Sequence, residues 1–142
     1  MIDSRILSIL KALTFDKVLI IKFVKFCVVG FTGVAVDFGI TYLLKEKFKV
    51  NKYIANACGF IVAATTNYFL NRSWTFNSQN PHILKEFIHF FIVAILGLVI
   101  NSIVLWSVNT KLKKGFYFSK LIAIGAATLW NFIANLIFTF AQ

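Results

Sequence analysis

Residues 87–108 read FIHFFIVAILGLVINSIVLWSV, a continuous run without Asp, Glu, Lys or Arg. A helix of about 20 apolar residues crosses the hydrocarbon core of a bilayer, which is about 30 Å thick. Three further runs of similar character, with Asp37 as their one charged residue, lie elsewhere in the chain, at residues 26–44, 53–70 and 121–142. The sequence therefore predicts an all-α integral membrane protein with four transmembrane helices.

The composition supports a membrane protein over a soluble one. Hydrophobic residues make up 59% of the 142 residues and charged residues only 14%, too few to cover a soluble domain. The 15 Lys and Arg residues, against 5 Asp and Glu, lie in flanks and loops beside the apolar runs. This placement indicates contacts with lipid headgroups and not with nucleic acid.

The orientation in the membrane is weakly determined by charge. Seven basic residues fall on each side of the predicted bilayer, so their total number does not determine the orientation by the positive-inside rule. Lys22 and Lys25 adjoin the first apolar run, and the first helix usually dominates orientation. We therefore expect both termini in the cytoplasm.

The N-terminal residues, 1–21, differ from the domain formed by residues 22–142. Their apolar residues share one stripe of a helix with charged residues around it, which predicts an amphipathic helix on the membrane surface. A frayed terminus is the alternative. The residues of the stripe are Ile2, Ile6, Ile9, Leu10 and Leu13.

The chain contains an internal repeat. Residues 23–76 align with residues 87–140 without a gap, and 12 of the 54 positions are identical. Each repeat contains two predicted crossings, so the two repeats are expected to be parallel and related by a pseudo-twofold axis along the membrane normal, an arrangement common in transporters. The identical pairs include Gly33 and Gly97, Asn67 and Asn131, Asn71 and Asn135, Thr75 and Thr139, and Phe76 and Phe140.

Small and polar residues recur every four positions in the second and fourth runs. Small residues at this spacing allow two helices to approach closely. Each step of four drifts by about 40° around an α-helix, so we expect a neighbouring helix to cover only the small half of each stripe. The predicted packing residues are Gly33, Ala55, Gly59, Ala63, Gly97, Ala123 and Ala127; the stripes continue into Asn67 and Asn71, and into Asn131 and Asn135. The asparagines are expected to bind a ligand, to hold helices together, or to do both.

Asp37, Arg72 and Lys120 each have an uncharged repeat mate. The mates of Asp37, Arg72 and Lys120 are Asn101, Leu136 and Asn56. An ionised Asp37 within a span is costly in lipid, so it should face protein or water, either as a proton-coupling group, as a partner of Arg72 or Lys120, or as a snorkelling residue. The planar guanidinium of Arg72 suits bidentate binding of a phosphate. Snorkelling to the headgroups is its alternative role.

The same residues carry a family resemblance. Val29-Gly30 and Gly33 before Asp37, followed by Asn67-x-x-x-Asn71-Arg72-x-Trp74-Thr75-Phe76, resemble the GtrA-like family of small four-helix membrane proteins, over about residues 23–140. The resemblance implies a bacterial cytoplasmic (inner) membrane protein that moves a polyprenyl-phosphate-linked sugar for cell-surface polysaccharide or teichoic-acid glycosylation. The lipid-phosphate and sugar-binding candidates are then Asn67, Asn71, Arg72, Trp74, Phe76, Lys120, Asn131, Asn135 and Asp37.

Three functions remain open from the sequence. The first is a flippase for a polyprenyl-phosphate-linked monosaccharide, working by alternating access between the repeats. The second is a membrane partner that anchors or activates a glycosyltransferase, and the third is a small exporter coupled through Asp37. An enzyme is not expected, because the sequence has no Ser/His/Asp set, acidic pair, metal-ligand cluster or phosphate-binding Gly loop. We expect no cofactor or metal, and we expect membrane lipids, a glycosyltransferase and a second copy of the chain as partners.

Overall fold

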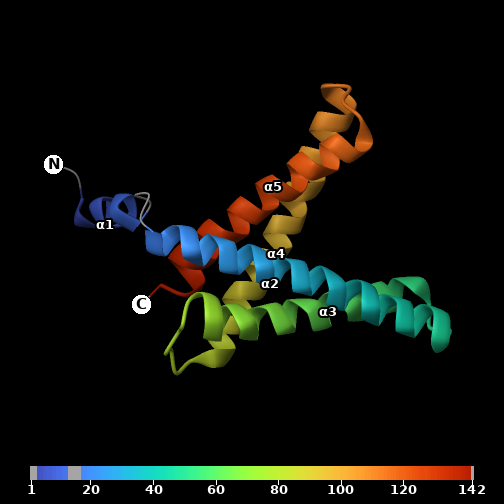
Figure 1. Ribbon diagram of the computed structural model, residues 1–142, viewed down its shortest axis with the longest axis horizontal. Coiled ribbons are helices and arrows are strands. Elements are labelled where there is room, and N and C mark those ends of the chain that lie inside the picture. Colours follow the sequence, from blue (N-terminus) through green and yellow to red (C-terminus); the bar gives the residue numbers. More distant parts are fainter. Residues whose placement is uncertain (1–2, 13–16, 142) are drawn as a thin grey trace. The chain divides into compact units, whose positions relative to one another are not determined.

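The computed structural model describes residues 3–12 and 17–141, which form helices and loops without a strand (Figure 1). The chain divides into two compact units, Met1–Ser78 and Gln79–Gln142, each described by itself below. The first contains α1 (Ser4–Ala12), α2 (Lys17–Tyr42), η1 (Leu43–Lys47), α3 (Lys52–Leu70) and η2 (Asn71–Thr75). The second contains α4 (Ile83–Trp106), η3 (Ser107–Lys111), α5 (Phe116–Ala134) and η4 (Asn135–Thr139). The label η marks a π-helix, which is wider than an α-helix.

The first unit is built on an antiparallel hairpin of α2 and α3, which lie side by side in Figure 1. Near its open end, the rings of Phe26 and Phe76 meet edge to face with their centroids 6.2 Å apart. Toward the tip, the Thr41 hydroxyl lies 3.5 Å from the Ala55 carbonyl oxygen. Residues later in α2 thus meet residues earlier in α3, as in an antiparallel pair. We call this unit's helix pair the first hairpin.

The second unit repeats this construction in α4 and α5, the second hairpin. The rings of Phe90 and Phe140 lie 6.1 Å apart at its open end. Farther along, the Trp130 indole N–H donates a hydrogen bond to the Val93 carbonyl at 3.2 Å. The indole nitrogen therefore has a partner, as such groups usually require away from water.

Element boundaries in the two hairpins are related by the same offset as the sequence repeat. This holds for the last residues of α2 and α4, for all of η1 and η3, for α3 and α5, and for η2 and η4. It also holds for Lys49 and Lys113, which have positive φ angles of 55° and 52° just after the tips' π-helices. The same local chain path is therefore encoded twice.

Each long helix widens to a π-helix in its last turn. The Phe76 N–H bonds to the Asn71 carbonyl at 2.9 Å, and the Phe140 N–H bonds to the Asn135 carbonyl at 2.8 Å, each across a π-helical turn. A π-helix satisfies terminal carbonyls that an α-helix leaves without partners. Such short π segments are frequent at functional sites.

The small-residue stripe of α3 faces α2 along its polar part as well as its small part. A Cβ added to Gly59 would overlap the Asp37 carboxylate, and one added to Gly33 would overlap the Asn67 side chain. Asn71 and Thr75 are also buried. The expectation that a neighbouring helix covers only the small half is therefore wrong. Part of the reason is η2, because in its wider π turn the step of four from Asn71 to Thr75 falls short of a full turn and offsets the drift that builds up along α3.

Three segments are long and apolar enough to cross a membrane among the residues that the structure describes: Lys17–Lys47, Ile83–Lys111 and Phe118–Thr139. The expected fourth span, α3, is not among these three segments. It is less apolar than α2, α4 and α5 because it carries Asn and Thr residues. The helices also begin before the apolar runs, since α2 starts at Lys17 and α5 at Phe116. Lysine stems can pack on apolar surface while their ammonium groups reach the headgroups, so charged residues do not end such helices.

The N-terminal helix α1 covers Ser4–Ala12. Ile6 and Ile9 are exposed on it. Ile2 and Leu13 of the expected stripe, and the side chain of Leu10, lie outside the described part of the chain. A position on the membrane surface stays a prediction for this helix.

The contact between Gly33 and Asn67 predicts a compensating pair of substitutions. Gly33→Ala should destabilise the first hairpin by about 1–3 kcal/mol, because its Cβ would overlap the Asn67 carboxamide. Adding Asn67→Ala should recover part of this loss, since it removes the obstructing group. Unfolding of the wild type, the two single variants and the double variant in bicelles would measure the coupling free energy between the two positions. Gly125→Ala is the control, because nothing lies within 4 Å of its added Cβ.

Candidate functional site

The family signature ends in η2, at the open end of the first hairpin. One side of η2 is buried and contains Asn71, Thr75 and the following Phe76. The Thr75 hydroxyl donates a hydrogen bond of 2.8 Å to the Asn71 side-chain oxygen. Asn71 also accepts the Phe76 N–H at its backbone carbonyl, so this part of the signature stabilises the helix end.

The second hairpin repeats the buried residues of η2 but has no cation at the position of Arg72. Asn135, Thr139 and Phe140 are buried at the end of η4, as their mates are in η2. The mate of Arg72 there is Leu136. These buried residues occur with and without the cation, which favours packing, and a ligand contact stays a prediction for Asn71, Phe76 and Asn135.

Asn67 and Asn131 take the same role in their own hairpins. The carboxamide of Asn67 lies against Gly33, and that of Asn131 lies against Gly97. Their side-chain oxygens have no hydrogen-bond partner in the described structure. Each carboxamide fills the space that the absent side chain of the glycine leaves open between the two helices. Both asparagines therefore join helices within their hairpins.

The two π-helical ends differ in their hydrogen bonds. In η4, the side-chain amide of Asn135 donates a hydrogen bond of 2.7 Å to the backbone carbonyl of Asn131. The Asn135 side-chain oxygen and the Thr139 hydroxyl, both buried, have no partner among the described residues. The second hairpin thus lacks the side-chain bond that joins Thr75 to Asn71.

Arg72 and Trp74 flank the buried side of η2. Residues two positions apart on a helix do not face each other, so these side chains leave η2 in different directions. Arg72 is half-buried, while Trp74 is 47% exposed. The structure therefore separates the signature into a buried part, which includes Asn71 and Phe76, and two accessible side chains.

Lys25 is a site residue that the sequence interpretation treated only as a headgroup contact. Its ammonium nitrogen lies 5.3 Å from the centre of the Trp74 ring and 3.4 Å from the Trp74 carbonyl oxygen. The neighbouring Phe26 packs on Phe76 and so fixes α2 against η2. The mates of Lys25 and Trp74 are His89 and Phe138. This difference between the repeats was a signal in the sequence that pointed to Lys25.

Glu86 is a second residue whose placement the sequence did not indicate. It lies in the first turn of α4 and is only 1% exposed. The partial positive charge of a helix N-terminus favours a carboxylate there. The apolar run that begins at the next residue gave no sign of this burial.

Asp37 faces α3 within the first hairpin. Its carboxylate accepts a hydrogen bond of 3.3 Å from the Thr41 hydroxyl, one turn further along α2. It also lies against Gly59, whose missing side chain leaves room for it. The expectation that Asp37 faces protein agrees with this geometry. Its position within the helix pair favours a packing role.

The remaining candidates lie in the second unit. Lys120 is exposed near the start of α5, whereas Asn131 and Asn135 lie at the other end of that helix. About 16 Å along the helix axis separates Lys120 from Asn131 at the usual rise of an α-helix, so the lysine does not join the asparagines in one cluster. Ala123 is fully buried and Ala127 half-buried on the same helix. No group of three His, Cys, Asp or Glu side chains suited to a metal occurs in residues 3–12 and 17–141.

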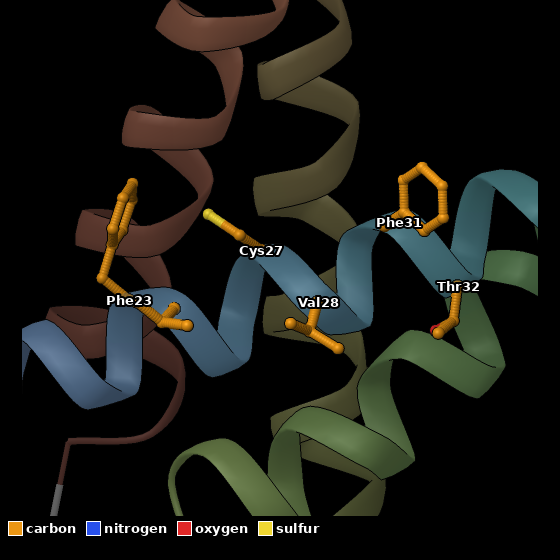
Figure 2. A pocket seen from close by; sticks show the side chains of 6 residues that line it. Phe23, Cys27, Val28, Phe31 and Thr32 are labelled. Atoms are coloured by element: carbon orange, nitrogen blue, oxygen red, sulfur yellow. The ribbon is translucent and has the colours of Figure 1, made fainter.

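An open hollow of about 350 Å³ lies along α2, between Phe23 and Thr32 (Figure 2). Phe23, Cys27 and Phe31 project from the same side of the helix in this view. The Thr32 hydroxyl at the edge of the hollow bonds back to the Val29 carbonyl at 2.7 Å, so it adds little polarity. The hollow suits a hydrocarbon chain better than a polar headgroup.

The position of Asp37 predicts a mild effect for Asp37→Asn. An asparagine oxygen can still accept the Thr41 hydrogen bond, and the second repeat already has Asn101 at this position. Hairpin stability should therefore stay close to wild type across a pH series. The proton-coupled exporter would instead be supported by a pH-dependent transport activity that Asp37→Asn abolishes.

Comparisons with known proteins agree with the sequence motif. Residues 25–140 match the family model of the GtrA/DPMS transmembrane domain. The chain is 29% identical over 118 residues to the uncharacterized membrane protein YngA of Bacillus subtilis, covering 83% of this chain and 78% of that protein. It is 33% identical over 86 residues to a dolichol-phosphate mannosyltransferase of Pyrococcus furiosus, covering 60% of this chain and 24% of that protein. The resemblance seen in the sequence is thereby confirmed, and the chain belongs to the GtrA/DPMS transmembrane-domain family of membrane proteins.

Proposed function

We propose that this protein moves a polyprenyl-phosphate-linked monosaccharide across a bacterial cytoplasmic membrane, for glycosylation of a cell-surface polysaccharide or teichoic acid. It is not an enzyme in this proposal and uses no cofactor. The proposal rests on a difference in charge between the two π-helical ends, η2 and η4, in a chain of this family. The first hairpin adds Arg72 and Lys25 to a scaffold that the second hairpin repeats without them.

Phosphate chemistry explains why cations belong at this end of the first hairpin. The carbonyl groups at a helix C-terminus give that end a partial negative charge, which disfavours a phosphate. A guanidinium can offset this charge and bind two phosphate oxygens at once. Arg72 lies in the last turn of η2, where that compensation is needed.

Four spans in two parallel repeats would suit the movement of a lipid. The 19 residues of α3 and the 5 of η2 extend for about 35 Å, enough to cross a hydrocarbon core beside α2. Alternating access between two repeats is a common transport mechanism. The hollow along α2, whose lining is mostly apolar, would suit part of a prenyl chain.

A second function is favoured by one relative. The region shared with the dolichol-phosphate mannosyltransferase is 24% of that protein, so most of that protein lies outside the shared region. A GtrA-like chain could then serve as the membrane partner of a separate glycosyltransferase. In that role it would anchor or activate the transferase and move no lipid.

Translocation in proteoliposomes separates the two functions. The purified protein should speed the movement of a labelled polyprenyl-phosphate monosaccharide from the inner to the outer leaflet, and Arg72→Ala should abolish this activity. A protein that moves no lipid but raises the activity of a co-purified glycosyltransferase would support the partner function. Labelled phosphatidylcholine serves as the control for a leaky membrane.

A further inference from the structure

The pairing of Lys25 with Trp74 is specific to one helix end. Phe26 and Phe76 pack at 6.2 Å in the first hairpin, and Phe90 and Phe140 pack at 6.1 Å in the second. The adjacent positions differ, since Lys25 and Trp74 are replaced by His89 and Phe138 in the second repeat. Of the two equivalent helix ends, the common scaffold therefore holds a lysine over an indole only in the first hairpin.

The contacts of the Lys25 ammonium group are weak ones. Its hydrogen bond to the Trp74 carbonyl is 3.4 Å long, against about 2.7–2.9 Å for strong charge-assisted bonds. Its distance of 5.3 Å from the ring centre falls within the range of a cation–π interaction, which is modest at accessible sites. An ammonium group has three donors. A negatively charged phosphodiester, such as that of a lipid-linked sugar, could therefore take Lys25 away from Trp74.

The position of the ammonium group also matters. The last carbonyls of a helix point out of its C-terminal end, so a cation on the Trp74 carbonyl lies at the end of η2. Arg72 belongs to the last turn of the same helix. Both cations therefore belong to the C-terminal end of η2, where they offset its partial negative charge.

We propose that Lys25 is a second phosphate-binding side chain, which rests on Trp74 while the site is empty and moves to the ligand's phosphate on binding. This inference rests on the proposed function, because it takes the phosphate to be that of a lipid-linked sugar. Movement of Lys25 uncovers the indole of Trp74, which is already 47% exposed. The freed ring face can then stack on the apolar face of the sugar.

Fluorotryptophan NMR in lipid nanodiscs tests this inference directly. The chain has three tryptophans, so each gives one resonance, assigned by single Trp→Phe variants. Titration with a long-chain polyprenyl phosphate should shift the Trp74 resonance saturably and leave those of Trp106 and Trp130 in place. Lys25→Met should weaken binding about tenfold, because it removes a charge-assisted bond. Lys25→Arg should restore most of the affinity.

The chain offers a matched control at the tip of the second hairpin. The Lys111 ammonium lies 5.1 Å from the centre of the Trp106 ring, a cation–π pair of similar geometry. Lys111→Met should shift the Trp106 resonance and leave lipid affinity unchanged. Phosphatidic acid and inorganic phosphate, titrated separately, distinguish a site for prenyl phosphates from one for any phosphate.

The outcomes separate this inference from the proposed function. Binding by Lys25→Met that equals wild type, or a Trp74 resonance that does not respond to saturating prenyl phosphate, would overturn the role of Lys25. Loss of affinity in Lys25→Met, in a protein that moves no lipid in proteoliposomes, would support that role and refute the flippase. Equal shifts of the Trp74 resonance with prenyl phosphate and with phosphatidic acid would overturn a site that is selective for the polyprenyl lipid.

Discussion

Gly59→Leu is expected to separate α2 from α3 and to destabilise the first hairpin by about 3 kcal/mol or more. Even a Cβ at this position would overlap the Asp37 carboxylate and the Thr41 hydroxyl, and it would lie 2.7 Å from the Asp37 backbone oxygen. Side chains can rotate away, but the backbone oxygen belongs to a helix and cannot. Steric trapping in bicelles would measure the free energy of unfolding.

Gly39→Leu is the matched control for this prediction. Gly39 lies on α2, is exposed, and has nothing within 4 Å of an added Cβ. The same substitution there should leave the free energy of unfolding near that of wild type. A Gly59→Leu protein as stable as Gly39→Leu would contradict the close packing of α2 against α3.

The sequence allowed much of the hairpin architecture to be predicted. The offset of the repeat, found from pairs such as Asn67 and Asn131, is also the offset between the boundaries of equivalent helices. Small residues were expected at helix contacts, and an added Cβ at Gly33 or Gly59 would overlap a side chain of the other helix of the hairpin. These features follow from periodicity and side-chain size, which the sequence contains directly.

The π-helical ends could not be predicted from the residues. No residue type marks a widened last turn, because it depends on which carbonyls find partners. Without it, the drift calculation placed Asn71 away from α2, and its burial was missed. Lys25 was missed for another reason: its role depends on Trp74, which lies far along the chain at the end of the next helix.

The signature residues were found as one motif, but the structure gives them different roles. Asn71 and Phe76 are buried, as are their mates in the second repeat, whereas Arg72 and Trp74 have accessible surface. A sequence motif records residues that occur together and does not distinguish packing from binding. The comparison of the two repeats favours packing for the residues that recur and are buried in both, such as Asn71 and Phe76.

Arg72→Ala is expected to lower the affinity for a polyprenyl phosphate by about ten- to a hundredfold, as the loss of a bidentate charge-assisted pair implies. Arg72→Lys should bind with intermediate affinity, since an ammonium retains the charge but not the fork of donors. Native mass spectrometry of protein released gently from its membranes would count the retained lipid. Membrane insertion should be unchanged.

Leu136→Ala provides the control at the equivalent position of the second hairpin. It shortens a side chain in η4 as Arg72→Ala does in η2, so any general effect of truncation at a π-helical end should appear in both variants. Only Arg72→Ala removes a cation, and only that variant should lose the lipid. Retention of the lipid by both proteins would reduce Arg72 to a snorkelling residue, and the case for a phosphate at this helix end would then depend on Lys25.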